Sequence, residues 1–556
     1  MKKLFSFTAV QKIISGLVAC FVLAIASYFL ATAMIDSLYN YRSPLEGAPP
    51  QPGSSLGQPS TRRLVFVLID GLRYDTSLQA QTMPVLNSLR DQGASATMHS
   101  RPPSYSEQGY TTLLTGAWPA LNDGPAINLD YEKIPTWTQD NLFSAAKRAG
   151  LSTAVSGYYW FEKLIPQDAV SAHFYTPGDD QAADREVVDA ALPWLGQDYQ
   201  LVLIHIDQVD YAGHHEGGPR SPNWAAAAGR ADALLGEILS KMDLTQDTVL
   251  VVSDHGHIDA GGHGGIEPVV LTEPFILAGK GVKPGQYGDV QMVDVSPTLA
   301  ALLGTNLPAS AQGQPLVEML DLPAAITSAL PGAISAQQTG LLEAYTQAIG
   351  RPIAAAEIPQ DASVAVYQDL LQSTVSERLY LERGSRWATA GFILLLIVGI
   401  VTRIKPRVLA WNFGGAALAI FLFHLRYALI DGHPYSLSWV PGQTELIFYT
   451  AVTAGIGLVV GWLAVMLGRG IFRRPPRDAI VSALGYLMAV FLLLALPFGV
   501  SYALNGLTIT WTLPDFLSYF IAFLALLQVL MSALIGIILV GLTGLFALII
   551  SSRRRA

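Results

Sequence analysis

The hydrophobic positions along this chain fall into two kinds of run: long runs near both ends, and short runs between them. A helix needs about 20 consecutive apolar residues to cross a bilayer. Runs near that length, almost free of charge, cover residues 13–35, 387–402, 408–430, 444–467, 479–504 and 516–550. The pattern therefore predicts six membrane-spanning helices, one N-terminal and five C-terminal, with the long last run forming one tilted helix.

The middle of the chain has a different pattern, in which short aliphatic runs alternate with helix-like stretches. Continuous aliphatic runs stand at 64–69, 201–206 and 249–252. Such runs are typical of strands that are buried on both faces of a parallel sheet. Helices are predicted between them, at about 182–195 and 225–242. The pattern predicts an α/β fold, with a mostly parallel sheet sandwiched by helices.

These patterns divide the chain into five segments. We predict an N-terminal anchor over 1–36, a linker over 37–62, an α/β domain over 63–316, a helical connector over 317–386 and a C-terminal transmembrane bundle over 387–556. The linker is predicted because its Pro, Gly and Ser residues interrupt any apolar periodicity.

Two other interpretations of the N-terminal run fit less well than an uncleaved anchor. A cleaved signal peptide would have a shorter apolar run, and a small-residue cleavage site before a polar stretch. A lipoprotein cleavage box ending at Cys20 would be followed by polar residues, whereas Phe-Val-Leu-Ala-Ile follows here. Since Cys20 is the only cysteine, an internal disulfide and a cysteine zinc cluster are excluded.

The distribution of charged residues predicts how the helices are oriented across the membrane. Charged residues make up only 14% of the chain, against about 25% in soluble domains. Residues 387–556 contain 11 Lys or Arg and 4 Asp or Glu, whereas the first 386 residues contain 23 and 39. Ten of those 11 basic residues fall on one side of the predicted bundle, and basic loops stay in the cytoplasm. We therefore expect both termini to be cytoplasmic and the acidic α/β domain to be extracytoplasmic. An acidic domain of this kind also argues against binding of a nucleic-acid polymer.

Carboxylate and imidazole side chains gather where the aliphatic runs end. Asp70 follows the first run, Asp210 and His214 follow the second, Asp254 and His255 follow the third, and His263 lies in a glycine-rich stretch beyond it. Six of the ten histidines fall in two short segments: His205, His214, His215, His255, His257 and His263. Because the carboxyl ends of parallel strands meet at one edge of a sheet, these side chains predict a metal site there.

The ligand types suit a pair of divalent cations. Asp70, Asp254 and His255 can make one site, and Asp210, His214 and His263 can make another. Two cations about 4 Å apart would stabilise both the attacking and the leaving oxygen of a phosphoryl transfer. Zinc is the metal we expect, and the same ligands admit manganese. The alternative for Asp70 is an ordinary Asp-Gly turn or helix cap.

A nucleophile is expected between the first two runs, in the segment Arg101-Pro-Pro-Ser-Tyr-Ser-Glu-Gln-Gly-Tyr-Thr. A hydroxyl at a helix start can be deprotonated by a metal, and the helix N-terminus favours an anion. Spacing alone does not choose between Ser104, Ser106 and Thr111, and each could also be an ordinary helix cap.

Taken in order, these motifs resemble the alkaline phosphatase superfamily, in its type I phosphodiesterase/nucleotide pyrophosphatase branch. The motifs lie between about residues 64 and 316: Asp-Gly at 70–71, Pro-Ser-x-Ser at 103–106, Thr-Gly at 115–116, Asp-x-x-Gly-His at 210–214, Ser-Asp-His-Gly at 253–256 and Gly-His-Gly at 262–264. His205, five residues before Asp210, makes the chain similar to the ethanolamine phosphate transferases of GPI-anchor assembly. The Cys/Ser-x-Pro-x-Arg segment of sulfatases is absent.

The resemblance also implies roles for individual residues. Ser106 aligns with the family nucleophile, which is usually a threonine, and Asn128 with an asparagine that binds a phosphoryl oxygen. One metal would be held by Asp70, Ser106, Asp254 and His255, and the other by Asp210, His214 and His263.

What the resemblance implies for function is a membrane-bound, metal-dependent phosphodiesterase or phosphotransferase that forms a phospho-serine intermediate. The membrane bundle favours a lipid substrate with a headgroup such as phosphoethanolamine. One alternative is a nucleotide pyrophosphatase/phosphodiesterase, for which the anchor alone would suffice. Another, of a different class, is a non-catalytic membrane protein whose α/β domain binds partners.

Overall fold

The computed structural model describes residues 8–354, 357–359, 362–440 and 442–553. It divides into two compact units. The helical unit comprises Met1–Ser37, Tyr380–Ile509 and Pro514–Ala556, and the sheet unit comprises Leu38–Leu379 with Thr510–Leu513. The basic residues Lys2, Lys3, Arg554 and Arg555, which contribute to the predicted orientation, lie outside the described residues.

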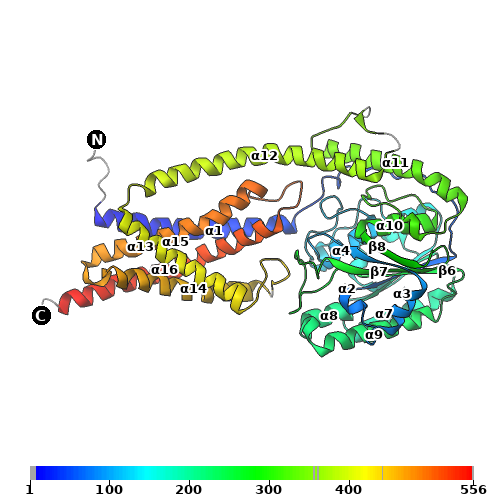
Figure 1. Cartoon of the computed structure of the whole chain (residues 1–556), viewed down its shortest axis with the longest axis horizontal. Helices are drawn as coiled ribbons and strands as arrows, with labels where there is room; N and C mark the ends of the chain where they lie inside the picture. Colours follow the sequence, from blue (N-terminus) through cyan, green and yellow to red (C-terminus); the bar gives the residue numbers. More distant parts are fainter. Residues whose placement is uncertain (1–7, 355–356, 360–361, 441, 554–556) are drawn as a thin grey trace. The chain divides into compact units, whose positions relative to one another are not determined.

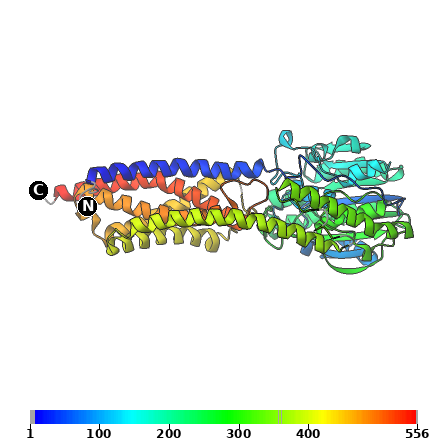
Figure 2. The same cartoon turned by 90° about the horizontal axis from the view of Figure 1, so that it is seen from above.

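The sheet unit is built on one eight-stranded sheet, visible between its helices in Figure 1, and Figure 2 shows the helices that lie over it. Its strands, in spatial order, are β4 (Ala172–Thr176), β3 (Thr153–Tyr158), β5 (Leu201–Ile206), β1 (Arg63–Ile69), β6 (Asp247–Val252), β7 (Thr272–Gly279), β2 (Ala94–His99) and β8 (Gly285–Gln291). Every neighbouring pair is parallel except the two that involve β7. The predicted mostly parallel sheet is confirmed.

The aliphatic runs became the centre of this sheet because they can be buried on both faces. All residues of β1, β5 and β6 are buried. β7 is antiparallel to β6 because the chain returns through the loop 253–271 without a crossover helix, and a parallel return requires one.

Helices cover both faces, as an α/β pattern predicts (Figure 1). One hydrophobic core joins the sheet to α3 (Pro84–Gln92), α7 (Gln181–Ala191) and α9 (Pro222–Leu239). The other joins it to α4 (Ser106–Thr115), α5 (Leu142–Arg148) and α10 (Val295–Leu303). The predicted helices at 182–195 and 225–242 correspond to α7 with a following 3₁₀ turn, and to α9.

Helix starts follow local capping chemistry. The Asp180 side chain accepts hydrogen bonds from the backbone N–H groups of Ala182 and Ala183 at the start of α7. The Ser221 hydroxyl accepts one from the Asn223 N–H at the start of α9, where Pro222 occupies the first helical position.

The remaining elements of the sheet unit are short or peripheral. They are the helices α2 (Tyr74–Ser77), α6 (Trp160–Leu164), α8 (Gln208–His215) and α11 (Ala324–Ala348), and 3₁₀ turns at Tyr131–Lys133, Gln167–Ala169, Leu192–Gly196, Gly218–Arg220, Met292–Asp294 and Val317–Met319. The linker was predicted over 37–62. Its first three residues are instead the end of the N-terminal helix, which runs to Tyr39, and residues 40–62 contain no helix or strand.

The helical unit is built from long apolar helices, which include the part of α12 (Val364–Val401) from Tyr380 onward. The others are α1 (Ala9–Tyr39), α13 (Pro406–His424), α14 (Gln443–Gly468), α15 (Pro476–Asn505) and α16 (Phe516–Arg553). A π turn at Leu425–Ile430 extends α13, and a 3₁₀ turn at Ile471–Arg473 precedes α15. Within the described residues, six helices are long and apolar enough to cross a membrane, which confirms the predicted number and their distribution over the chain.

Two details of these helices bear on the predicted segments. α16 is one uninterrupted helix of 38 residues, as its interpretation as a single span required. α12 runs without a break through residue 386, where the sequence pattern places the boundary between the connector and the bundle.

Candidate metal centre

Three neighbouring strands deliver acidic and imidazole side chains to one edge of the sheet. β1 pairs with β5 on one side and with β6 on the other, so the residues that follow each strand meet. Asp70 follows β1, His205 lies near the end of β5, and Asp254 and His255 follow β6. All four side chains are buried, and the predicted convergence at the carboxyl end of the sheet is observed.

Of the three candidate hydroxyls, Ser106 is the one that faces this cluster. It is the first residue of α4, and its Oγ lies 3.2 Å from His255 Nε2. The Ser104 hydroxyl donates to the Gly265 carbonyl and accepts from the Gly264 N–H, each at 3.1 Å. The Thr111 hydroxyl donates to the Glu107 carbonyl at 2.6 Å.

One group of possible ligands surrounds His255. Its Nε2 lies 3.4 Å from Asp70 Oδ1 and 3.3 Å from Asp254 Oδ2. Its Nδ1 lies 3.3 Å from the Gly256 carbonyl, which can only accept, so Nδ1 carries the proton and Nε2 presents a lone pair. Asp70 Oδ1 and Asp254 Oδ2 are themselves buried oxygens without a hydrogen-bond partner. Three electron-rich atoms thus converge, and a cation bound among them would stabilise this arrangement.

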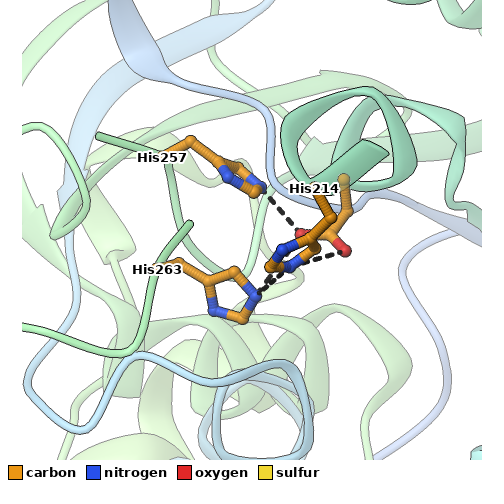
Figure 3. A group of neighbouring side chains, drawn as sticks. His214, His257 and His263 are labelled. Carbon is orange, nitrogen blue, oxygen red and sulfur yellow. Dashed lines mark hydrogen bonds and ion pairs between the residues drawn. The ribbon is translucent and has the colours of Figure 1, made fainter. Parts of the chain in front are cut away.

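A second group surrounds Asp210, as Figure 3 shows for its histidines. Asp210 and His214 are one turn apart on α8, with Asp210 Oδ2 and His214 Nε2 separated by 3.5 Å. His263 comes from the loop after β6, and its Nε2 lies 2.9 Å from His214 Nε2 and 3.5 Å from Asp210 Oδ1. The Ser104 carbonyl accepts from His263 Nδ1 at 2.9 Å, so Nε2 of this ring also presents a lone pair.

The electrostatics of the cluster favour bound cations. Burial raises the pKa of Asp254 well above its usual range, and the charges of Asp70 and Asp210 add to the effect. Burial lowers the pKa of His255 and of His263, so both rings are neutral, as metal ligands must be. Carboxylates that burial and mutual repulsion disfavour are stabilised by a divalent cation.

Asp210 behaves differently from Asp254. Burial alone would raise its pKa, but His214, His257 and His263 outweigh burial and hold the pKa well below its usual range. Asp210 is therefore ionised, with imidazoles around it.

The two groups are contiguous, because His255 Nε2 lies 4.0 Å from Asp210 Oδ1. The chain thus brings together all seven residues predicted to bind metal: Asp70, Ser106, Asp210, His214, Asp254, His255 and His263. Carboxylate, imidazole and hydroxyl groups gathered in this way fit the binding of divalent metal ions.

Asn128, predicted to bind a phosphoryl oxygen, lies beside the nucleophile candidate. Its Oδ1 accepts from the Glu107 N–H at 3.2 Å, and Glu107 Oε1 in turn accepts from the Leu129 N–H at 2.8 Å. Because Oδ1 is engaged by the backbone next to Ser106, the amide nitrogen of Asn128 is left to donate elsewhere.

Three further residues complete the cluster. Sequence reasoning counted His205 and His257 among the clustered histidines without a ligand role, and it did not single out Tyr110. His205 Nε2 lies 2.9 Å from Asp70 Oδ2 and 3.0 Å from the Tyr110 hydroxyl, which donates to the same carboxylate. His257 Nε2 lies 2.8 Å from Asp210 Oδ1. A histidine at the end of a predicted strand could have indicated a role in the site. Which ring nitrogen is protonated, and hence whether the ring donates or binds metal, cannot be seen from residue order.

Comparison with known proteins shows which families have sequences similar to this one. Residues 64–274 match the model of the type I phosphodiesterase / nucleotide pyrophosphatase family. The chain is 26% identical over 329 residues to the mouse GPI ethanolamine phosphate transferase 3, catalytic subunit, which covers 53% of this chain and 30% of the mouse protein. It is 27% identical over 292 residues to the human GPI ethanolamine phosphate transferase 2, catalytic subunit, which covers 48% and 29%. The chain thus spans less than a third of the length of these relatives.

Among solved structures, human ectonucleotide pyrophosphatase / phosphodiesterase 5 matches with a TM-score of 0.37 and 14% identity, over 44% of this chain and 95% of that one. The matched stretch of the family model begins with β1 and ends within β7, so it contains the seven predicted ligands. Over residues 64–274 the chain is therefore similar to the type I phosphodiesterase / nucleotide pyrophosphatase family.

Proposed function

We propose that this protein is a membrane-bound phosphodiesterase or phosphotransferase that acts on the phosphodiester of a lipid headgroup, with phosphoethanolamine as the transferred group. The observation that carries the proposal is the Ser106 hydroxyl, which lies 3.2 Å from His255 Nε2 at the junction of two ligand groups. The named activity of the mouse and human relatives supports the transferred group.

The chain's own residues account for most of the reaction. Two divalent cations held by the seven ligands would lower the pKa of the Ser106 hydroxyl and neutralise charge on the phosphate. Ser106 Oγ, with its proton released to solvent, forms a bond to phosphorus while the bond to the leaving oxygen breaks, and that oxygen takes a proton from water. The N-terminus of α4 and the amide of Asn128 face the negative charge that develops on the phosphoryl oxygens.

The resulting phosphodiester of Ser106 is then opened by a second oxygen nucleophile, which restores the serine hydroxyl. Water gives hydrolysis, and the hydroxyl of an acceptor gives transfer. Both outcomes use the same residues, so the choice between them lies with the acceptor.

The six apolar helices support a lipid substrate, since hydrolysis of a soluble nucleotide needs only the anchor. We further propose that the catalytic domain is extracytoplasmic and that both termini are cytoplasmic, because the basic loops of the bundle lie on one side.

Activity of the full-length protein in detergent, with bis(p-nitrophenyl) phosphate and added Zn²⁺, tests the nucleophile. We expect Ser106→Ala to lower kcat by on the order of 10³-fold or more, and Ser106→Thr, which keeps a hydroxyl, to retain activity. A Ser106→Ala protein as active as wild type contradicts the assignment. Absence of wild-type activity on every diester tried would favour a non-catalytic binding protein.

A second assay tests the substrate. Phosphatidylethanolamine vesicles and a nucleotide p-nitrophenyl ester are offered to the wild-type protein at equal concentration, and mass spectrometry looks for a modified Ser106 peptide. Phosphoethanolamine on Ser106 supports the lipid donor. A nucleotidyl adduct, with no reaction of the lipid, would instead support the nucleotide pyrophosphatase/phosphodiesterase alternative.

A further inference from the structure

His257 belongs to the Asp210 group, and neither the predicted ligand set nor the reaction above uses it. It is fully buried, two residues after His255. A nitrogen of its ring lies within 4.8 Å of ligand atoms from Asp210, His214 and His263. Distance alone would therefore make it a fourth ligand of the same cation.

The backbone partner of His257 argues otherwise. The Gly262 N–H donates to His257 Nδ1 at 2.9 Å. A nitrogen that accepts a hydrogen bond carries no proton, so the single proton of the neutral ring is on Nε2. Nε2 then donates to Asp210 Oδ1, 2.8 Å away. With one nitrogen protonated and the other occupied by an amide, neither has a lone pair to offer a metal.

The ligand histidines show the opposite arrangement. In His255 and His263 the partner of Nδ1 is a backbone carbonyl, of Gly256 and of Ser104 respectively. The carbonyl fixes the proton on Nδ1 and leaves Nε2 free to bind. The backbone thus distinguishes His257 from the two ligands beside it in the same loop.

The surroundings of His257 hold the ring in this one orientation. A Cβ at Gly213 would lie 2.2 Å from His257 Cε1, and one at Gly71 would lie 2.9 Å from Nε2, so the ring fills space that only glycine leaves. Trp224 packs edge-on at 5.3 Å, and its own Nε1–H donates to the Thr76 hydroxyl at 3.1 Å.

We propose that His257 is a positioning residue, whose Nε2–H donates to Asp210 Oδ1 and fixes the carboxylate that binds a divalent cation with His214 and His263. It is not itself a ligand. The inference rests on the metal centre of the proposed function. A donor of this kind orients a ligating carboxylate, and removal of such partners weakens metal affinity by about 10–100-fold.

Zinc binding by the full-length protein in detergent tests the inference, by competition with a chromophoric chelator. His257→Met keeps a similar length without a donor, and we expect unchanged Zn²⁺ per chain with affinity about 10–100-fold weaker at one site. His257→Gln keeps an N–H near the place of Nε2, and its affinity should stay within about threefold of wild type. His173→Met, at an exposed histidine on β4, is the matched control and should bind as wild type does.

Cobalt substitution separates positioning from ligation. We expect Co²⁺-loaded His257→Gln to show the wild-type d–d absorption, since the ligand set is unchanged. A changed spectrum, or loss of one metal per chain in both variants, would make His257 a ligand and overturn the inference. His257→Met with wild-type affinity would also overturn it. If the wild-type protein binds no Zn²⁺, the metal centre of the proposed function fails, which is a distinguishable result. Should His257→Met not fold, the His257→Gln spectrum still decides.

Discussion

The two carboxylates Asp70 and Asp210 each have a histidine donor, but they are set in different surroundings. Asp70 follows a central strand and is held by His205, from the neighbouring strand, and by Tyr110. Asp210 lies on the short helix α8, and its donor His257 comes from a loop. The Asp70 side chain is 1% exposed and that of Asp210 is 16% exposed. The comparison indicates a rigid half and an accessible half of one centre.

The largest expected effect comes from removing one ligand histidine on each side. His255→Ala removes the imidazole that meets Ser106, Asp70 and Asp254, so we expect kcat to fall by on the order of 10³-fold or more. His214→Ala should act mainly on Zn²⁺ affinity, with activity partly restored by excess Zn²⁺, because its side chain is 39% exposed and water can replace it. Titration of each variant's kcat with Zn²⁺ measures this. Equal rescue of both variants would remove the distinction between the halves.

The next effect concerns Asp184, a buried carboxylate that accepts from the N–H groups of Asp207 and Gln208 at the start of α8. Burial raises the pKa of Asp184 to about 6. Its protonated form is therefore favoured in the folded state, and the contribution of Asp184 to stability is lost as pH rises from about 4 through about 6.

Asp184→Asn removes that ionisation. The variant is expected to be the less stable protein at pH 4, and the stability gap to wild type should narrow by about 2 kcal/mol by pH 7. Denaturant unfolding of both proteins in EDTA across this range checks it. A gap that does not vary with pH would show that Asp184 does not titrate there.

Gly213→Ala tests the accessible half without touching a ligand. The new Cβ would lie 2.2 Å from the His257 ring, which has to move and loses its contact with Asp210. We expect Zn²⁺ affinity to fall by about 10-fold or more and the domain to be destabilised by about 1–3 kcal/mol. Gly236→Ala on α9, where the nearest atom would be 3.4 Å away, is the control. Wild-type affinity in Gly213→Ala would show that the ring has room.

Tyr110→Phe is the smallest change, and it acts on the rigid half. It removes one of two donors to Asp70 and leaves His205 in place. We expect kcat to fall by about 10-fold, with the number of bound Zn²⁺ unchanged. A loss as large as that of His255→Ala would mean that Asp70 depends on Tyr110 far more than on His205.

Much of this architecture could be predicted because it follows from periodicity. The runs at 64–69, 201–206 and 249–252 are continuous hydrophobic stretches. Such a stretch is what a strand buried on both faces of a sheet needs. The apolar spans are equally local signals. β2 and β8 escaped prediction because their sequences, Ala-Ser-Ala-Thr-Met-His and Gly-Gln-Tyr-Gly-Asp-Val-Gln, have no such run.

The candidate site also has a part that could be predicted from the sequence and a part that could not. The residue types that could bind metal were readable at the ends of the runs, and the structure brings them together. Residue spacing alone left Ser104 and Ser106 open, and the family resemblance indicated Ser106. In the structure the Ser104 hydroxyl is instead bonded to the loop at Gly264 and Gly265. The separation of His257 from His263 depended on a backbone N–H in one case and a carbonyl in the other. Such partners come from the folded backbone, and residue spacing does not encode them.

The loop between β6 and β7 has a consequence for how the centre assembles. It supplies His255 to one ligand group, His263 to the other and His257 between them. Ordering a flexible segment has an entropic cost, and a segment that is already tethered at one point needs less of it to be fixed at a second. Whatever immobilises His255 therefore raises the effective concentration of His263 at its own site. We therefore expect the two ligand groups to bind metal ions cooperatively, because one loop supplies a histidine to each.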